Sequence, residues 1–214
     1  MGDIVAAAWR MLADYAVKML PGILAAALAY GLLLPRRRRS LASACLLSSR
    51  AREAAMLVFW AFCGGMAILT LTPDWFDWRS ILAGGVHMPF FMWGTVNLRP
   101  FGSYWGTLWS ALIVLANVVM FLPFGFFPAL LWRNDTWWKA LLAGFAVTLF
   151  IECCQLCVGR AFDVDDLLLN TTGAMLGYWL WLLLRKMAPR FTARFQVVSL
   201  PPPGRGPAVD NRCV

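Results

Sequence analysis

Residues 152–173 have the sequence Glu152-Cys-Cys-Gln155-Leu-Cys-Val-Gly-Arg160-Ala-Phe-Asp163-Val-Asp165-Asp166-Leu-Leu-Leu-Asn170-Thr-Thr-Gly173, and this stretch decides how the chain can fold. It places a cluster of polar side chains between two segments that are otherwise apolar enough to lie in a membrane. A charged residue inside a bilayer costs about 2.5–3.5 kcal/mol on insertion scales. We therefore expect these side chains to face one another, and to have a use.

The composition is that of an integral membrane protein. Of the 214 residues, 61% are hydrophobic and only 14% are charged, whereas a soluble domain has roughly 25% charged residues. The net charge of +8 is explained by basic loops that orient membrane proteins. Because no soluble domain remains to carry it, we expect no nucleic-acid binding.

The apolar runs predict an all-α, polytopic helix bundle with five transmembrane helices. A spanning helix needs about 20 mainly apolar residues, and five runs meet this length. Gly173 and Gly177 form a small-xxx-small pattern that favours close helix packing. The predicted spans are Tyr15–Leu34, which Pro35 would end, Glu53–Leu71, Gly106–Trp132, Trp138–Val158 and Leu167–Leu184.

Basic residues predict an N-terminus outside and a C-terminus inside. With that orientation the inner segments 35–52, 133–139 and 185–214 hold 14 of the 19 basic residues, including the run Arg36–Arg39. Positive charge concentrates on the cytoplasmic side of membrane proteins. The orientation places Asp163 and its neighbours on the outer side.

The predicted organisation has three parts. Residues 1–14 form a short interfacial segment, residues 15–185 form the transmembrane domain, and residues 186–214 form a basic, partly disordered cytoplasmic tail. Between the second and third spans, residues 73–105 form a Trp- and Phe-rich outer loop at the headgroup level, where aromatic rings favour the interface. The tail from about Ser199 has no apolar pattern and is expected to be disordered.

The topology brings polar residues of the last three spans together. Glu152 is expected about 9 Å below the outer end of its helix, from a rise of about 1.5 Å per residue. Residues three or four apart share a helix face, so Gln155 lies beside Glu152, and Asn170 lies beside Asp166. The third span brings Asn117 to a similar depth. Arg160 and Asp163 occupy the outer turn.

Each of these residues also has a structural interpretation. Asn117, Gln155 and Asn170 are typical of interhelical hydrogen bonding, worth about 0.6–2 kcal/mol each in membranes. Asp163 has the position of a helix cap. Asp165 points away from the face shared by Asp163 and Asp166 and is expected to be solvated. Arg160 has the option of pairing with Asp163 or Asp166. An intramembrane acid such as Glu152 is by default a functional residue.

We expect no metal and no cofactor. Cys154 and Cys157 have the spacing of a metal or redox pair. A second pair is absent, and the only histidine, His87, is distant in the sequence.

Three patterns together resemble the VanZ-like membrane proteins. They are Asn97-Leu-x-Pro100-Phe101, Asn117-x-x-x-Phe121-x-Pro123-x-Gly125, and Glu152-x-x-Gln155 followed by Arg160-x-x-Asp163-x-x-Asp166-x-x-x-Asn170-x-x-Gly173. The likeness covers about residues 55–185, with the motifs in residues 97–177. It implies a bacterial plasma-membrane protein that affects susceptibility to teicoplanin-type lipoglycopeptides, the property for which the family is named.

The favoured hypothesis is an outer-leaflet site that binds or modifies an amphiphile with a polar head. Its partner would be a membrane lipid, a lipid-linked cell-envelope precursor or the lipoglycopeptide. Glu152 would act as general acid or base, and Arg160 would hold an anionic head. The candidate catalytic residues are Glu152, Asp163 and Asp166, and the candidate ligand-binding residues are Asn97, Asn117, Gln155, Arg160 and Asn170.

Two other hypotheses stay open. In one, the polar cluster serves only helix packing or a protein partner, and the chain is a non-enzymatic membrane module. In the other, the chain is a small proton-coupled transporter built around Glu152. Five spans without an internal repeat argue mildly against transport, since many transporters contain paired repeats.

Overall fold

The computed structural model describes residues 2–73, 76–84, 91–101, 108–132 and 136–199. His87 and the tail beyond Ser199, both considered above, lie outside these residues. The described chain is a helix bundle with five helices long and apolar enough to cross a membrane. This confirms the all-α fold and the five spans.

The elements are α1 (Gly2–Ser43), β1 (Leu46–Leu47), α2 (Arg50–Leu71), α3 (Trp78–Leu82), β2 (Val96–Asn97), α4 (Leu108–Trp132), α5 (Trp137–Cys157), β3 (Phe162–Asp163), α6 (Val164–Met187), α7 (Pro189–Ala193) and β4 (Val198–Ser199).

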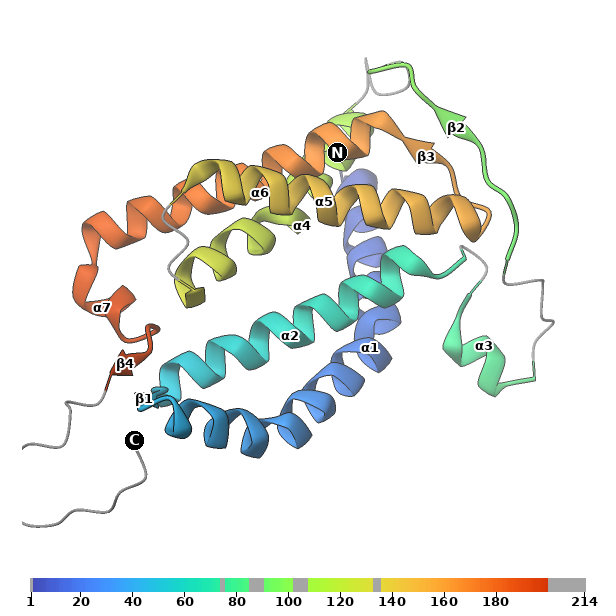
Figure 1. Cartoon of the computed structure of the whole chain (residues 1–214). Coiled ribbons are helices and arrows are strands. Elements are labelled where there is room, and N and C mark those ends of the chain that lie inside the picture. The colour runs from blue at the N-terminus through green and yellow to red at the C-terminus, as the bar shows by residue number, and fades with distance from the viewer. Residues whose placement is uncertain (1, 74–75, 85–90, 102–107, 133–135, 200–214) are drawn as a thin grey trace, which may run out of the picture.

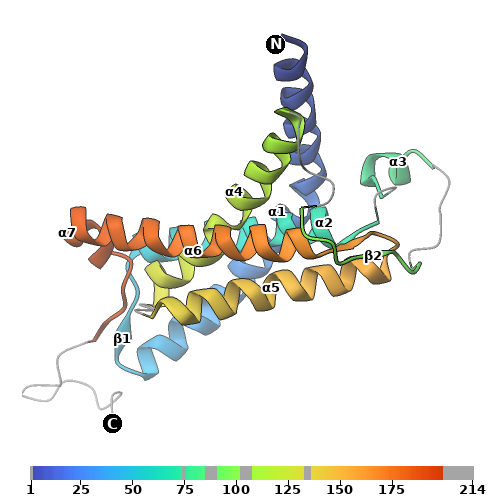
Figure 2. The same cartoon turned by 90° about the horizontal axis from the view of Figure 1, so that it is seen from above.

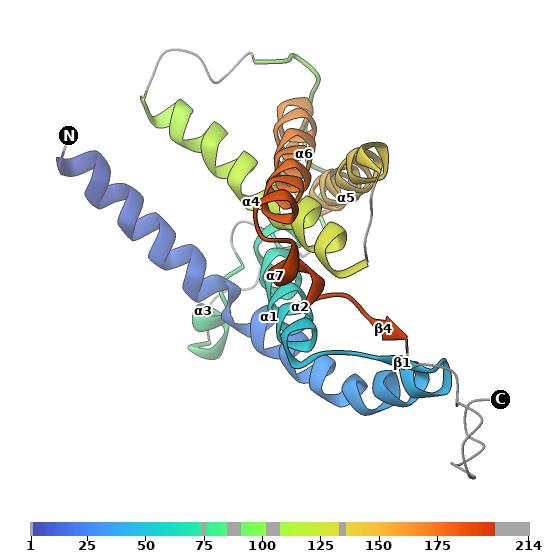
Figure 3. The ribbon, with the colours of Figure 1, turned by 90° about the vertical axis from the view of Figure 1, so that its left-hand side faces the viewer.

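Helix α1 is longer than the first predicted span. The prediction that Pro35 ends the helix is wrong, since α1 continues through Pro35 to Ser43. Forty-two residues would extend about 63 Å if straight, roughly twice the hydrocarbon thickness of a bilayer. The helix is bent between its two ends (Figure 3). Pro21 lies inside it, and proline removes a backbone hydrogen bond and kinks a helix. Residues 2–14 are continuous with this helix.

Helices α5 and α6 run side by side and antiparallel, with α4 packed against them (Figures 1 and 2). The predicted close packing at Gly173 and Gly177 is confirmed. A Cβ added at Gly173 would lie 2.3 Å from the backbone oxygen of Val118, and one at Gly177 would lie 2.0 Å from that of Leu122. The two glycines therefore let α6 approach the backbone of α4 directly.

Buried side chains fill three junctions of the bundle. Each junction joins three helices. The largest of them surrounds Trp181 of α6. The three clusters are Ala129, Leu130, Ala140, Tyr178 and Trp181; Tyr30, Met56 and Leu131; and Met66, Phe121 and Ile151.

The connection between α2 and α4 is tied to the bundle at two places. Within it, α3 is anchored to α1, because Arg79 donates to Asp14 at 2.9 Å and the Trp78 indole donates to the carbonyl of Val17 at 3.2 Å. Further along, β2 pairs with β3 in parallel, with Asn97 opposite Asp163. This second attachment positions the functional candidates.

Candidate functional site

The predicted site residues lie near one end of the bundle. Glu152 and Gln155 lie in the last turns of α5, and Asp166 and Asn170 lie on α6. Asn117 comes from α4 and Asn97 from β2. Arg160 and Asp163 lie in the short connection from α5 to α6, where Asp163 is part of β3, so the site draws on α4, α5, α6, β2 and β3.

A segment of the outer loop is docked along the α5–α6 connection. The Met92 amide donates to the carbonyl of Cys157 at 3.0 Å, and the Gly94 amide donates to that of Leu156 at 2.8 Å. Gly94 lies so close to the connection that an added Cβ would be 1.7 Å from the Arg160 carbonyl oxygen. The loop is therefore held by its backbone against the site, an attachment that the sequence did not predict.

Asp163 links three segments of the site through hydrogen bonds. Its carboxylate caps α6 by accepting from the Asp165 amide at 2.9 Å, as predicted. It also accepts from the side-chain amide of Asn97 at 3.1 Å. Its own backbone amide donates to the Glu152 carboxylate at 2.8 Å. Asp163 thus joins the loop, the start of α6 and the end of α5.

The prediction that Asp165 is solvated is wrong. Its side chain is completely buried, and both carboxylate oxygens accept from the Phe101 amide, at 2.7 and 3.0 Å. Phe101 has a positive φ of 58°, a conformation in which non-glycine residues need local support. The helix-face argument failed because the partner of Asp165 is a backbone amide of the docked loop, the same loop that contacts Asp163 through Asn97.

Two carboxyl groups from adjacent spans lie in the interior of the site. Glu152 is only 1% exposed and lies within electrostatic range of Asp166 and Arg160. Asp166 accepts from the side-chain amide of Asn117 at 2.6 Å. Asp166 therefore joins α6 to Asn117 of α4 within the site.

Two predicted members lie apart from these contacts. Asn170 donates to the hydroxyl of Thr148 at 2.9 Å, one turn deeper between α5 and α6. Its side-chain oxygen has no hydrogen-bond partner among the described residues. The side chain of Gln155 is buried. The backbone carbonyl of Gln155 accepts from the backbone amide of Arg160 at 2.9 Å. Asn170 therefore acts as an interhelical link at a different depth from Glu152.

Arg160 connects the site to α2. Its guanidinium donates to the carbonyl of Leu69 at 3.1 Å, in the last turn of α2, where a cation is favoured by the helix dipole. The same charge lies within electrostatic range of Glu152 and Asp166. We refer to Glu152, Asp163, Asp165 and Asp166, with the donors Asn97 and Asn117 and with Arg160, as the carboxylate network.

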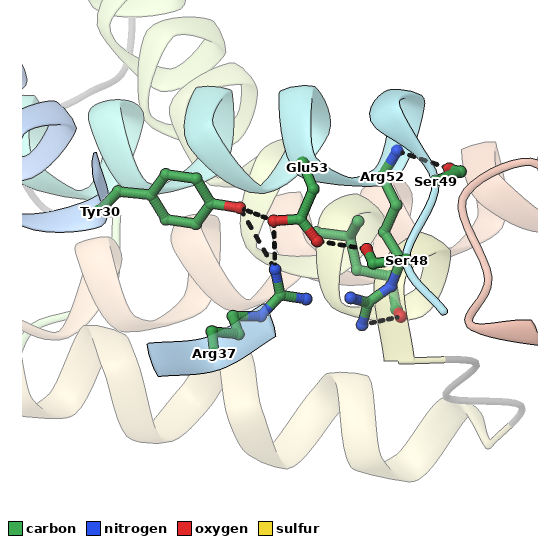
Figure 4. A network of polar contacts seen from close by, with 7 residues as sticks. Tyr30, Arg37, Ser48, Ser49, Arg52 and Glu53 are labelled. Atoms are coloured by element: carbon green, nitrogen blue, oxygen red, sulfur yellow. Dashed lines mark hydrogen bonds and ion pairs between the residues drawn. The ribbon is translucent and has the colours of Figure 1, made fainter. Parts of the chain in front are cut away.

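A second polar cluster, which sequence reasoning missed, surrounds Glu53 in the first turn of α2 (Figure 4). The Glu53 carboxylate accepts from the side chains of Tyr30, Arg37 and Ser48. The neighbouring Arg52 donates to the carbonyl of Leu131 at 3.1 Å. We refer to these five side chains, Tyr30, Arg37, Ser48, Arg52 and Glu53, as the arginine network.

A weak signal for the arginine network exists in the sequence. Tyr30 and Arg37 are seven residues apart and therefore share a helix face, and an acid follows at the start of the next apolar run. No local pattern shows that Glu53 folds back on them. Within the described part of the chain, no three His, Cys, Asp or Glu side chains gather in a way that would hold a metal ion.

The comparison with known families agrees with this geometry. The model of the VanZ/LLP1 family matches residues 59–185, more than half of the chain. The match contains the whole carboxylate network. It begins after the last residue of the arginine network, Glu53. No curated protein and no solved structure matches the chain. The chain is an integral membrane protein that belongs to the VanZ/LLP1 family.

Proposed function

We propose that the carboxylate network binds the polar head of a membrane amphiphile. The observation that carries this proposal is the pair of acids from adjacent spans, Glu152 and Asp166, held near Arg160. The donors to these carboxylates are neutral amides, the backbone N–H of Asp163 and the side chain of Asn117. Such bonds hold the acids in place without neutralising them, so the negative charge or proton remains for another group.

The chemistry of the network limits the ligand class. A carboxyl group can donate or accept a proton, which suits general acid–base or water-mediated chemistry. Arg160 supplies a positive charge for an anionic head. A cell-envelope lipid, a lipid-linked precursor and a teicoplanin-type lipoglycopeptide all combine an apolar anchor with a polar or anionic head. We place the protein in the bacterial plasma membrane, where these molecules are found.

Substitution of Glu152 by glutamine tests the proposal. Glutamine keeps the shape and can accept from the Asp163 amide, so melting in detergent should stay close to wild type. Binding of the amphiphile, and any change in teicoplanin susceptibility that the protein causes in an expressing bacterium, should be lost. The control is Asn170→Ala, since the structure has this residue linked to Thr148 and apart from Glu152; the variant should lower melting without abolishing binding. A Glu152→Gln protein with full binding and phenotype would refute the proposal.

A non-enzymatic membrane module is the second candidate. It is favoured by the hydrogen bonds of Asn97, Asn117 and Asn170, which each go to another side chain of the protein. In that case Glu152→Gln should leave every functional readout intact, and asparagine variants should lower stability and function together. A third candidate, proton-coupled transport, requires net flux into liposomes that depends on Glu152.

The orientation of the chain is part of the proposal. The distribution of basic segments supports an N-terminus outside, a C-terminus inside and a carboxylate network in the outer leaflet. Labelling of a cysteine placed near Asp163 in a cysteine-free background decides the orientation. If a membrane-impermeant reagent labels that cysteine only from the cytoplasmic side, the topology is inverted and the outer-leaflet site is wrong.

A further inference from the structure

Arg52 is a buried cation whose protein partners leave part of its guanidinium unbonded. The residue is 4% exposed. Nη2 donates to the Leu131 carbonyl, while Nε and Nη1 are buried and have no hydrogen-bond partner among the described residues. A buried polar group without a partner is costly, and a charged one more so. The side chain therefore has two donors suited to an acceptor from outside the chain.

The bond to Leu131 explains only part of this arrangement. Leu131 lies in the last turn of α4, where carbonyl groups lack helical partners and favour a cation. A cap of this kind needs a single donor, and a lysine would provide it. The planar guanidinium has five donors and matches carboxylate or phosphate oxygens in a bidentate manner.

A second arginine lies beside Arg52. Figure 4 shows the guanidinium groups of Arg37 and Arg52 below Ser48 and Glu53 in that view, and the charge of Arg37 acts on that of Arg52. The one acid of the network, Glu53, is ion-paired with Arg37. Two arginines and one glutamate leave a net positive charge. Arg37 is 23% exposed at its side chain, so the cluster has an open side.

The neighbouring residues add to this positive charge without taking part in the cluster. The rest of the basic run, Arg36, Arg38 and Arg39, is exposed, and only Arg37 of this run donates to Glu53. The segment after α7 is close by, since the Ser49 hydroxyl donates to the carbonyl of Arg194. The cluster therefore lies at the basic end of the bundle, in the part of the chain before the family match.

We propose that Arg37 and Arg52 form an anion site for a phosphate group, with the Arg52 Nε and Nη1 donors as its buried floor. The phosphate belongs to a phospholipid head in the leaflet on this side of the membrane, or to free phosphate. An anionic lipid fits the surroundings, because each basic residue near a leaflet adds about 1 kcal/mol of attraction to anionic lipids. The site is separate from the carboxylate network and does not depend on the function proposed for it.

The test uses the full chain, purified in detergent and stripped of lipid. Native mass spectrometry measures the affinity for phosphatidylglycerol and, as a probe without phosphate, for diacylglycerol with the same acyl chains. Arg37→Lys keeps the positive charge and the ion pair with Glu53, and Arg52→Lys keeps the charge and the hydrogen bond to the Leu131 carbonyl. Both variants remove the planar guanidinium with its several donors. Each should weaken phosphatidylglycerol binding about tenfold, the loss expected from one or two charge-assisted hydrogen bonds.

Arg38→Lys is the matched control, because it makes the same change at an exposed position of the same run; its affinity should equal that of wild type. Diacylglycerol binding should not distinguish any of these proteins. Should Arg52→Lys fail to fold, Arg37→Lys decides the result, since its guanidinium is on the open side of the cluster.

A second measurement identifies the source of the phosphate. Thermal melting of the lipid-free protein is compared in inorganic phosphate and in chloride of equal ionic strength. A higher melting temperature in phosphate, abolished by Arg52→Lys, together with lipid binding that the variants leave unchanged, assigns free phosphate. Lipid binding and phosphate protection that are both insensitive to the two lysine variants would overturn the proposal and leave Arg52 as a cap of α4.

Discussion

The two polar networks of this protein lie at opposite ends of α2 and handle buried charge in different ways. Glu53 lies in the first turn of α2, and the carbonyl of Leu69, which Arg160 reaches, lies in the last. Sixteen residues of helix separate them, about 24 Å. In the arginine network a carboxylate is ion-paired with Arg37. In the carboxylate network the acids accept from neutral amides.

The difference indicates what each network is for. A direct ion pair with additional hydroxyl donors satisfies the carboxylate of Glu53, and the unbonded donors that remain are cationic. Amide donors orient Glu152 and Asp166 without bringing an opposite charge of their own. One network is therefore suited to an anion, and the other to a proton or a polar head with its own donors. Each of the following variants acts on one side of this comparison.

Glu53→Ala should have the largest effect on stability. It leaves Arg37 and Arg52 together without their acid, and breaking a buried ion pair from one side costs about 3–5 kcal/mol. Because Arg37 is partly exposed, we expect the lower end, about 3 kcal/mol. Denaturant unfolding in micelles measures it. Glu53→Gln, which still accepts from Tyr30 and Ser48, is the control and should fall between the two proteins. An alanine variant as stable as wild type would remove the distinction between the networks.

Asp165→Ala should follow, with a loss of about 2 kcal/mol, because it removes the completely buried carboxylate that accepts from the Phe101 amide. Asp165→Asn keeps one acceptor oxygen and should lose less. The same unfolding measurement applies, and protease cleavage between residues 91 and 101 should become faster in the alanine variant as the loop detaches. If cleavage is unchanged while stability falls, Asp165 supports α6 and not the loop.

The sequence predicted the helices better than it predicted the contacts between them. Apolar length fixes a span, so all five were found, and the spacing of Gly173 and Gly177 indicated the packing of α6 on α4. Of the motif residues, Asn117 contacts Asp166 and Glu152 contacts the Asp163 amide, whereas Asn170 contacts Thr148 one turn away. Their depth and helix face follow from local periodicity.

Two of the three failures share a different physical origin. Asp165 was expected in solvent because its partner, the Phe101 amide, is 64 residues away and is a backbone group that no side-chain pattern reveals. The arginine network was missed for the same reason, since Arg37 and Glu53 lie on consecutive helices, α1 and α2, and come together only when the chain reverses direction between them. Pro35 was expected to end α1, but the structure continues the helix. Contacts between distant segments, rather than the elements themselves, were beyond local reasoning.

Gly94→Ala tests the docking of the loop by steric means alone. The added Cβ would lie 1.7 Å from the Arg160 carbonyl, so the loop must shift away from the α5–α6 connection. We expect a loss of about 1–2 kcal/mol, within the usual range for overpacking. The control is Gly31→Ala in α1, where an added Cβ meets nothing within 4 Å. The arginine network should be unaffected, which phosphatidylglycerol binding at wild-type affinity would verify.

Arg160→Lys should have the smallest effect on stability and the most selective effect on function. The lysine keeps the positive charge near Glu152 and Asp166 but lacks the planar guanidinium, and a hydrogen bond such as that to the Leu69 carbonyl contributes only about 0.5–1.5 kcal/mol. If Arg160 holds an anionic head, amphiphile binding weakens while melting in detergent barely changes. If Arg160 serves only to join α2 to the site, melting and function decline together. A lysine variant with full stability and full binding would exclude both roles, and would leave the acids of the carboxylate network to act without it.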